Sequence, residues 1–382
     1  MTDALVVAGV TTRALAISAA RAGYRVTAVD AFGDLDLRAA TDVIVVSDGG
    51  QRYSPSAAAA AAAAVPAGLA AYTSNFENYP EAVSRLAQGR RLLGNPPEVL
   101  ARVRNPLELM RALRRRGFAT PETRATKATT TPGTGAWLLK PRRSGGGHGV
   151  AVWRRGQTVP RTGYLQERIA GTAGSVVFAA DGRNAVPLGL TRQLVGDARL
   201  GSAGFRYCGN LLASSGSPLF PQEQELFETA ASLAVAVTAE FGLVGLNGLD
   251  FVARRGVPYP VEVNPRFSAS MELIERAHGI SMFQLHERAC RGILPHGPFR
   301  TAQIVGKAIV FARRDVTLAD TRRWLGDSSI ADVPHPGERI RQGHPICTVF
   351  AQADEAISCY RALIRHAAIV YRVAESQRRG AA

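Results

Sequence analysis

The sequence predicts a mixed fold, with an α/β unit at the N-terminus followed by α+β architecture. Three observations predict it. Strand-like and helix-like segments alternate over residues 1–95, and a double proline, Pro96-Pro97, then interrupts them. Further on, strand-like segments joined by short turns recur between residues 137 and 264. A chain of 382 residues has room for two or three such units, each with a buried core.

The N-terminal segment begins with a β-α-β pattern, formed by an apolar strand at 4–8, a helix at 12–22 and a second strand at 24–30. The second strand ends with Asp30, which raises the alternative of a dinucleotide site. Residues 9–13 lack the repeated glycines of that fingerprint, so we expect a Rossmann-like domain without a dinucleotide. Its remaining elements are a strand at 43–46, an alanine-rich helix at 56–64 and a strand at 68–72.

The double proline after Asn95 marks the first domain boundary, because two prolines cannot continue a helix. Helices are expected at 98–103 and 107–116, the second ending at Gly117. Residues 126–135 have the composition of a threonine-rich loop. The remaining predictions are helices at 220–241, 271–277 and 282–291, and a smaller β-rich unit after the Pro- and Gly-containing segment 292–299.

Lysine is rare in this chain, whose basic residues are nearly all arginine. The only lysines are Lys127, Lys140 and Lys307. Lys140 ends an apolar strand and precedes a loop that contains Gly145, Gly146 and Gly147. Glycines allow backbone N–H groups to close over phosphate oxygens, and a lysine adds a point charge. The loop lacks the Gly-Lys-Ser/Thr ending of a P-loop. We therefore expect a flexible phosphate lid, with an ordinary hairpin tip as the alternative.

Acidic and amide side chains lie on a predicted hairpin. In Val261-Glu262-Val263-Asn264 the valines alternate with polar residues, so Glu262 and Asn264 share one face of a strand. A turn at 254–258 would fold the preceding strand back and bring Asp250 beside them. Oxygen ligands of this kind suit magnesium, which nucleotide enzymes bind through one or two carboxylates together with phosphates and waters. The alternative is a solvent-facing hairpin that carries acids.

These motifs together resemble the ATP-grasp superfamily. The order is a lysine strand, a glycine lid, the hinge Gln166-Glu167-Arg168-Ile169, then Asp250 and Glu262-x-Asn264-Pro265-Arg266. More narrowly, residues 189–193, 205–210 and 331–351 resemble a group of predicted ATP-dependent carboligases related to biotin carboxylase and to the tyramine–glutamate ligase of methanofuran biosynthesis. The resemblance implies a Rossmann-like domain over 1–95, a two-subdomain ATP-grasp core over 96–298 and a small C-terminal β-rich domain over 299–382.

The resemblance also implies a role for each matching residue. The catalytic residues would be Arg266 and Lys140. The ATP-binding residues would be Arg104, Lys140, Gly145, Gly146, Gly147, Gln166, Glu167, Arg168 and Ile169, with the backbone of Arg168 and Ile169 meeting adenine. Two Mg²⁺ ions, with Mn²⁺ as the alternative metal, would be held by Asp250, Glu262 and Asn264. The substrate site would be lined by Arg192, Gln193, Arg206 and Ser268.

Two positions depart from the family pattern. Many relatives carry an Asp-Lys pair at the start of the helix that opens the nucleotide domain, and this chain has Pro106 in place of the lysine. Arg104 is the nearby cation that could reach the phosphates instead. Relatives also often place an acid after the hinge for the ribose hydroxyls, whereas residues 171–174 contain none. The ribose contacts are therefore unassigned.

The resemblance implies an ATP-dependent carboxylate–amine ligase that works through an acyl phosphate and releases ADP and phosphate. Its partners would be a small carboxylic acid and an amine. Arginines suit carboxylates, so a glutamate-like acid is expected, and kinship with the methanofuran ligase suggests one-carbon cofactor biosynthesis. Two alternatives stay open: a non-catalytic, regulatory ATP-binding protein, and a carboxylase similar to biotin carboxylase.

Composition narrows the remaining classes. The formal net charge is +15, but the arginines are spread through every segment, so nucleic acid is not an expected partner. No apolar run is long enough to span a bilayer, and residue 1 is followed by a strand rather than a leader, so we expect a cytoplasmic protein. The four cysteines lack metal-ligand spacing and are expected to be reduced. A homodimer is one open assembly state.

Overall fold

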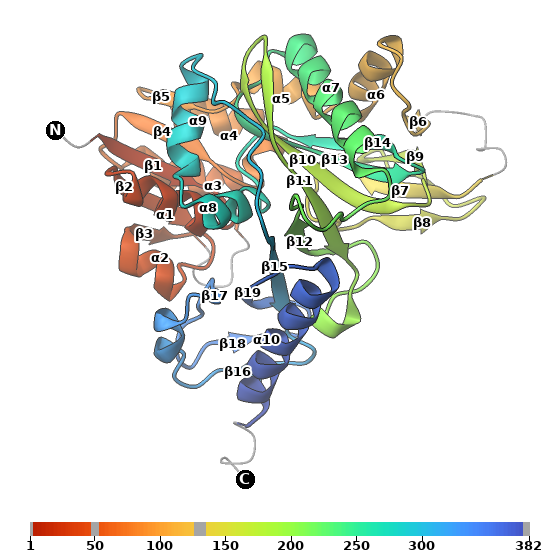
Figure 1. Ribbon diagram of the computed structural model, residues 1–382. Helices are drawn as coiled ribbons and strands as arrows, with labels where there is room; N and C mark the ends of the chain where they lie inside the picture. The colour runs from red at the N-terminus through yellow and green to blue at the C-terminus, as the bar shows by residue number, and fades with distance from the viewer. Residues whose placement is uncertain (1–2, 47–52, 126–134, 377–382) are drawn as a thin grey trace.

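The computed structural model describes residues 3–46, 53–125 and 135–376, and the following statements refer to these ranges. Lys127 and residues 126–134 of the predicted loop lie outside them. The N-terminal unit lies on one side and the strands and helices of residues 97–264 lie on the other. The C-terminal strands and a long helix lie below them (Figure 1). The predicted mixture of α/β and α+β architecture is confirmed.

The N-terminal unit is a five-stranded parallel sheet in the order β3-β2-β1-β4-β5. Its strands are β1 (Ala4–Ala8), β2 (Arg25–Asp30), β3 (Asp42–Val45), β4 (Leu69–Tyr72) and β5 (Arg91–Leu93). The connecting helices are α1 (Arg13–Arg21), α2 (Leu35–Ala40), α3 (Pro55–Ala63), η2 (Phe76–Asn78) and α4 (Pro80–Ala87). Parallel strands require such crossovers, so the alternation in the sequence gives this topology.

Asp30 is a structural residue of this unit. Its carboxylate accepts hydrogen bonds from the backbone and hydroxyl of Thr12, at 2.6 and 2.8 Å, and from the N–H groups of Phe32 and Gly33. The side chain is buried and ties the loop after β1 to the end of β2. These bonds use both carboxylate oxygens of Asp30.

A small antiparallel sheet, in the order β6-β9-β7-β8, carries the lysine strand and the hinge. Its strands are β6 (Thr123–Arg124), β7 (Trp137–Pro141), β8 (Ala151–Trp153) and β9 (Gly163–Glu167). Two helices precede it, α5 (Pro97–Val103) and α6 (Pro106–Arg115). Pro106 occupies the first position of α6, where its missing N–H has no intrahelical partner to lose, and the Asn105 side chain caps the helix by accepting from the N–H of Leu107.

An eight-stranded sheet forms the centre of the molecule, in the order β14-β13-β10-β11-β12-β15-β19-β17. Its first five strands are β10 (Thr172–Asp181), β11 (Ala185–Val195), β12 (Tyr207–Leu212), β13 (Val244–Arg254) and β14 (Val257–Asn264). The other three come from the C-terminal part of the chain: β15 (Ile304–Phe311), β17 (Ile330–Ala331) and β19 (Pro345–Ala353). The strands after residue 298 therefore extend the same sheet, while the proposed division at 298/299 remains a prediction.

Helices cover this sheet. They are α7 (Glu223–Phe241), α8 (Met271–His278), α9 (Met282–Cys290) and α10 (Ala356–Ser376), and a two-stranded sheet joins β16 (Val316–Thr317) to β18 (Arg339–Ile340). Helix α10 was absent from the expectation of a β-rich C-terminal unit. It packs against β15 and β19 (Figure 1). No helix within the described ranges is both long and apolar enough to cross a membrane.

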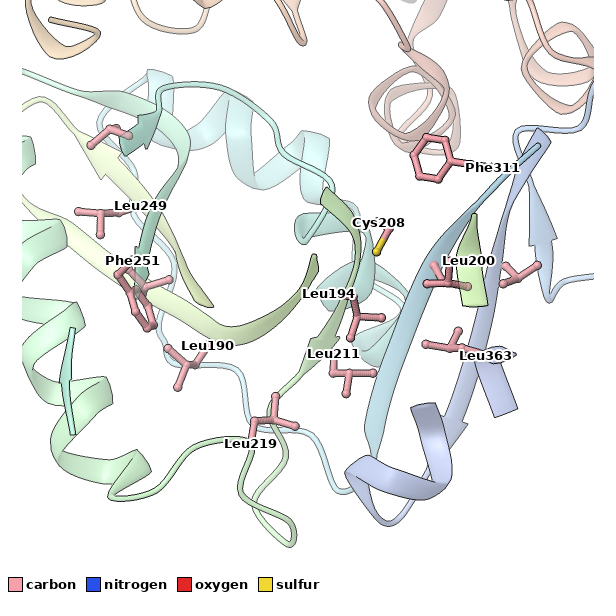
Figure 2. Close-up of a cluster of buried hydrophobic side chains, with 14 of the residues drawn as sticks. Leu190, Leu194, Leu200, Cys208, Leu211, Leu219, Leu249, Phe251, Phe311 and Leu363 are labelled. Atoms are coloured by element: carbon pink, nitrogen blue, oxygen red, sulfur yellow. The ribbon is translucent and has the colours of Figure 1, made fainter. Parts of the chain in front are cut away.

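The largest apolar core lies between the eight-stranded sheet, α7 and α10. Leu190 and Leu194 of β11 both enter this core, where Figure 2 shows Leu211 near Leu194 and Leu363 near Leu200. A second apolar cluster joins β1 and α1 of the N-terminal unit to α8 and α9. This cluster holds the N-terminal domain against α8 and α9, which follow β14 in the chain.

We expect Leu363→Ala to lower the free energy of unfolding by about 2–5 kcal/mol, because its fully buried side chain anchors α10 to the sheet. Ile369→Ala on the same helix is the control, since that side chain is about half exposed and should change stability by less than about 0.5 kcal/mol. Urea unfolding followed by circular dichroism measures both. Equal effects would contradict the docking of α10.

Candidate nucleotide and metal site

The β13–β14 hairpin brings the three predicted metal ligands together. Asp250 is directly opposite Glu262, and Gly248 is opposite Asn264, with a register shift after Asp250. The Asn264 amide donates to Asp250 Oδ2 at 3.0 Å. The described residues contain no cluster of three His, Cys, Asp or Glu side chains suited to a metal. Two carboxylates and one amide fit Mg²⁺ in a site that phosphates and waters complete, and metal binding here remains a prediction.

The two carboxylates have opposite electrostatic environments. Burial and the nearby charge of Glu262 raise the pKa of Asp250 to about 6. Burial also opposes ionisation of Glu262, but Arg104 and Lys140 outweigh it and lower the pKa of that carboxyl. Glu262 is thus the ionised member of the pair. Arg104 and Lys140 stabilise its negative charge, as a bound divalent metal would.

We expect Mg²⁺-nucleotide binding to weaken as the pH falls below about 6, because Asp250 takes up a proton there and a ligand must be deprotonated. An Asp with the usual pKa of 3.8 would stay ionised, and binding would then not change with pH down to about pH 5. Titration calorimetry with MgADP between pH 5 and 8 measures the effect. Asp250→Asn is the comparison variant, and its binding should lack this pH dependence.

Arg104, which follows α5, lies beside Glu262 of the hairpin. Its Nη1 lies 3.3 Å from Glu262 Oε2 and donates to the Val263 carbonyl at 2.8 Å. Its Nε and Nη2 both donate to Asn78 Oδ1, at 3.1 and 2.9 Å, and Nη2 also donates to the Ser144 carbonyl. One guanidinium therefore connects the β13–β14 hairpin, called the metal hairpin below, to the lid and to the N-terminal domain.

Lys140 faces the same space from β7. Its Nζ donates to Gln166 Oε1 at 3.1 Å and lies over the ring of Tyr164. Burial alone would lower the pKa of Lys140, but Tyr164 and Glu262 raise it by more. The net pKa is raised, so the lysine stays charged. The buried Gln166 side chain therefore orients Lys140. A small cavity of about 20 Å³, room for about one water, is lined by Arg104, Pro106, Lys140, Ser144, Tyr164 and Glu262.

The glycine lid is closed in this structure. Tyr207 donates its N–H to the Gly146 carbonyl at 3.0 Å, and a Cβ on Gly147 would lie 1.8 Å from the Phe205 carbonyl oxygen. Gly147 also has a φ of +76°, whereas a Cβ on Gly145 would meet no atom within 4 Å. These contacts hold the lid against residues 205–207.

The hinge differs in one respect from the expectation. Arg168 donates its N–H to the Ala136 carbonyl at 2.8 Å, so this group already has a partner. Glu167 accepts from the N–H of Glu122 through its side chain, at 3.0 Å, and helps to fix the strand. The proposed adenine contacts are therefore the Arg168 carbonyl and the backbone of Ile169.

Arg266 lies at the end of β14 and contacts both the metal hairpin and the N-terminal domain. Its Nη2 is 2.8 Å from Glu77 Oε1 and donates to Asn264 Oδ1 at 3.3 Å. Its Nη1 donates to the Phe267 carbonyl. The side chain is 10% exposed and that of Glu77 is 0% exposed. This is the position from which a cation could stabilise a transferring phosphoryl group.

Two of the four expected substrate residues lie near the metal hairpin. The Gln193 side chain lies near enough to Asp250 to oppose the rise in the pKa of that carboxyl. Ser268, Ser175 and Asn264 surround Gly248. The Ser268 and Ser270 hydroxyls are 3.1 Å apart.

The other two substrate residues lie elsewhere. Arg192 is exposed and alternates with Gln193 on β11, so it points to the opposite face of the sheet from Asp250. Arg206 donates to the Gly343 carbonyl at 2.7 Å and lies over the ring of Phe311. It therefore holds the C-terminal strands, and we remove both arginines from the proposed site.

Sequence reasoning missed Glu77 and Asn78, which hold Arg266 and Arg104. They belong to η2, far from the motifs along the chain. Acidic and amide residues in a loop after a strand are common, so no signal in the sequence distinguished them. Only the docking of the two domains brings them to the site.

Residues 103–270 match the ATP-grasp domain family. This range contains Arg104, Lys140, the glycine lid and the β13–β14 hairpin, the two halves of the site described above. This match covers less than half of the chain, and over those residues it supports the resemblance to the ATP-grasp superfamily.

A curated relative matches part of the chain. Over 120 residues the chain is 29% identical to an uncharacterized protein of Methanocaldococcus jannaschii. The aligned segment covers 31% of this chain and 29% of that relative, so the match spans less than a third of either protein.

Solved structures match nearly the whole chain. The biotin carboxylase domain of 2-oxoglutarate carboxylase from Hydrogenobacter thermophilus, in complex with MgADP, ADP and bicarbonate, has a TM-score of 0.69 and 16% identity, covering 95% of this chain and 89% of that one. The L-amino acid ligase of Bacillus licheniformis has a TM-score of 0.69 and 17% identity, covering 96% and 97%. At these identities the likeness establishes a common fold.

Proposed function

We propose that this protein is an ATP-dependent ligase that joins a carboxylic acid to an amine through an acyl phosphate, and releases ADP and phosphate. One observation carries the proposal. Asp250, Glu262 and Asn264 lie together beside Arg104, Lys140 and Arg266, under a closed glycine lid. Carboxylates for magnesium and convergent cations for phosphate are what phosphoryl transfer requires, since positioning and charge neutralisation supply most of its catalysis.

The residues have separate roles in this chemistry. Arg104, Lys140 and the lid would bind the phosphates, while Asp250, Glu262 and Asn264 would hold Mg²⁺, which neutralises phosphate charge when bound. An oxygen of the substrate carboxylate attacks the γ-phosphorus, the bond to ADP breaks, and Arg266 faces the new acyl phosphate. The amine nitrogen then attacks the acyl carbon, and phosphate leaves with the electron pair of the C–O bond. An amine that enters as ammonium loses one proton to phosphate and one to solvent.

The acid is proposed only as a small carboxylic acid. A glutamate-like substrate, and a role in methanofuran-type cofactor biosynthesis, follow from the sequence resemblance. The arginines that suggested a second substrate carboxylate, Arg192 and Arg206, lie off the site. The neighbours with this fold include both a carboxylase and an amino acid ligase, so the carboxylase alternative is carried into the test.

Acid-dependent formation of hydroxamate tests the proposal. Purified protein is incubated with Mg-ATP, hydroxylamine and a panel of carboxylic acids that includes the amino acids, and hydroxamate and ADP are measured. A ligase gives both products in equal amounts with at least one acid. ADP release that depends on bicarbonate, without hydroxamate from any acid, would favour the carboxylase alternative, and nucleotide binding without ADP release would favour the regulatory one.

A further inference from the structure

A short segment of the N-terminal domain places a buried carboxylate beside Arg266. Glu77 of η2 is 1% exposed, and its Oε1 lies 2.8 Å from Arg266 Nη2. Although the charges are paired, neither carboxylate oxygen has a hydrogen-bond partner within the described residues, and Arg266 Nε has none either. Buried polar groups nearly always have such partners, so this arrangement is incomplete without a further group.

Two more buried oxygens near Glu77 share this property, namely the Tyr53 hydroxyl and Asn75 Oδ1. Tyr53 packs against the apolar cluster that contains Phe76, the residue before Glu77, and burial followed by the charges of Asp30 and Glu77 raises its pKa. In the described part of the chain, eight buried side-chain atoms lack a partner, and five belong to Tyr53, Asn75, Glu77 and Arg266. Their concentration in one place indicates a ligand site.

The position of this cluster fits a substrate site. Asn75 and Glu77 follow β4 at the carboxyl edge of the parallel sheet, and the loop after β4 contacts the loop after β1, where Ser74 accepts from the N–H of Val10. The strand order reverses between β1 and β4, and open α/β sheets bind ligands at such a point. Tyr72 at the end of β4 donates to the Pro265 carbonyl, so this edge faces the end of β14.

The cluster is also directly connected to the candidate phosphate site. Glu77 contacts Arg266, which contacts Asn264. The next residue, Asn78, accepts from Arg104, which contacts Glu262. The segment η2 therefore touches both arginines that flank the metal hairpin, and a group bound at Glu77 would lie next to the acyl phosphate.

We propose that Tyr53, Asn75 and Glu77 form the subsite for the amine substrate, an inference that rests on the proposed ligase function. Three of the four orphaned oxygens, those of Asn75 and Glu77, can only accept hydrogen bonds, and the Tyr53 hydroxyl can accept as well. A primary amine in its ammonium form donates three and carries the charge that a buried carboxylate needs. When it binds, Glu77 exchanges Arg266 for the ammonium group, and Arg266 is released toward the acyl phosphate.

Amine kinetics test this subsite, with the acid taken from the hydroxamate assay and methylamine as the amine probe. We expect Tyr53→Phe, Asn75→Ala and Glu77→Gln each to raise the KM for methylamine roughly 10-fold or more, as expected for the loss of a hydrogen bond to a charged group. The KM for the acid should change much less. Within the described residues, Tyr53 and Asn75 make no hydrogen bond or ion pair with Arg266, so their variants separate amine binding from any disturbance of that arginine. Tyr24→Phe, in the same domain as Tyr53, is the matched control, and the Tyr24 ring packs against Phe283 of α9.

The outcomes are distinct. No hydroxamate with any acid would overturn the proposed ligase and the subsite with it. Hydroxamate formation without any methylamine-dependent ADP release would overturn the subsite alone, since it would not take an alkylammonium. Equal methylamine KM values in the wild type, Tyr53→Phe and Asn75→Ala would also overturn it and would leave the orphaned groups to ordered water.

Discussion

Replacing Glu262 with Gln is expected to reduce acid-dependent ADP release by roughly 10²–10³-fold, the loss that follows removal of one preorganised electrostatic contact. The substitution keeps the shape of the side chain and removes its charge. Glu262 is the anion of the carboxylate pair, because Arg104 and Lys140 lower its pKa while that of Asp250 is raised. A neutral residue here would leave Mg²⁺ with one ionisable ligand that is half protonated near pH 6.

The fold should survive this change. Arg104 would retain its bonds to Asn78, to the Val263 carbonyl and to the Ser144 carbonyl. Circular dichroism and urea unfolding check this, and Glu225→Gln, an exposed change on α7, is the control for loss of one charge. Turnover equal to wild type in Glu262→Gln would show that the hairpin does not hold the metal.

Adding a methyl group at Gly147 is expected to lower kcat/KM for ATP on the order of 100-fold, the cost of a misplaced reactive group. The new Cβ would lie 1.8 Å from the Phe205 carbonyl oxygen, which is backbone and cannot turn away. The φ of +76° adds strain for any residue with a side chain. The lid of Gly147→Ala therefore cannot reach β12 and cannot close over the phosphates.

Gly145→Ala is the matched variant for this test. It changes the same loop by the same group, but its Cβ would meet nothing within 4 Å and its backbone is not left-handed. We expect its effect on kcat/KM to be several-fold smaller at least. Initial rates over a range of ATP concentrations, with limited proteolysis of the lid, measure both variants. Similar losses in the two would mean that flexibility of the loop matters, rather than its contact with β12.

Local pattern was sufficient for part of the site. Strand alternation predicted that Glu262 and Asn264 share a face, and the turn at 254–258 predicted that Asp250 would come beside them. Both follow from a side-chain period of two and from turn chemistry, which depend on neighbours in the chain. The lysine and glycine loop were recognisable for the same reason, since β7 and β8 form a hairpin around them.

Other parts depended on contacts that no local pattern encodes. Arg192 was a reasonable carboxylate ligand by residue type, but its place in the register of β11 turns it away from Asp250. Arg206 was chosen for the same chemistry and instead binds the Gly343 carbonyl. Helix α10 was overlooked, although Leu363 and Ala367 recur at helical spacing on its buried side. Its partner strands β15 and β19 are themselves joined to the central sheet only by long-range pairing.

The sequence by itself determined the order of most elements, the hairpin that pairs Asp250 with Glu262, the glycine loop and the match of residues 103–270 to the ATP-grasp domain family. These depend on backbone propensity and on spacing within a few residues. Only the tertiary structure decided that Arg104 lies beside Glu262, and that Glu77 and Asn78 from the N-terminal domain hold Arg266 and Arg104. The physical reason is that apolar packing of the N-terminal domain on α8 and α9 brings η2 to the end of β14, across a gap of nearly two hundred residues in the chain.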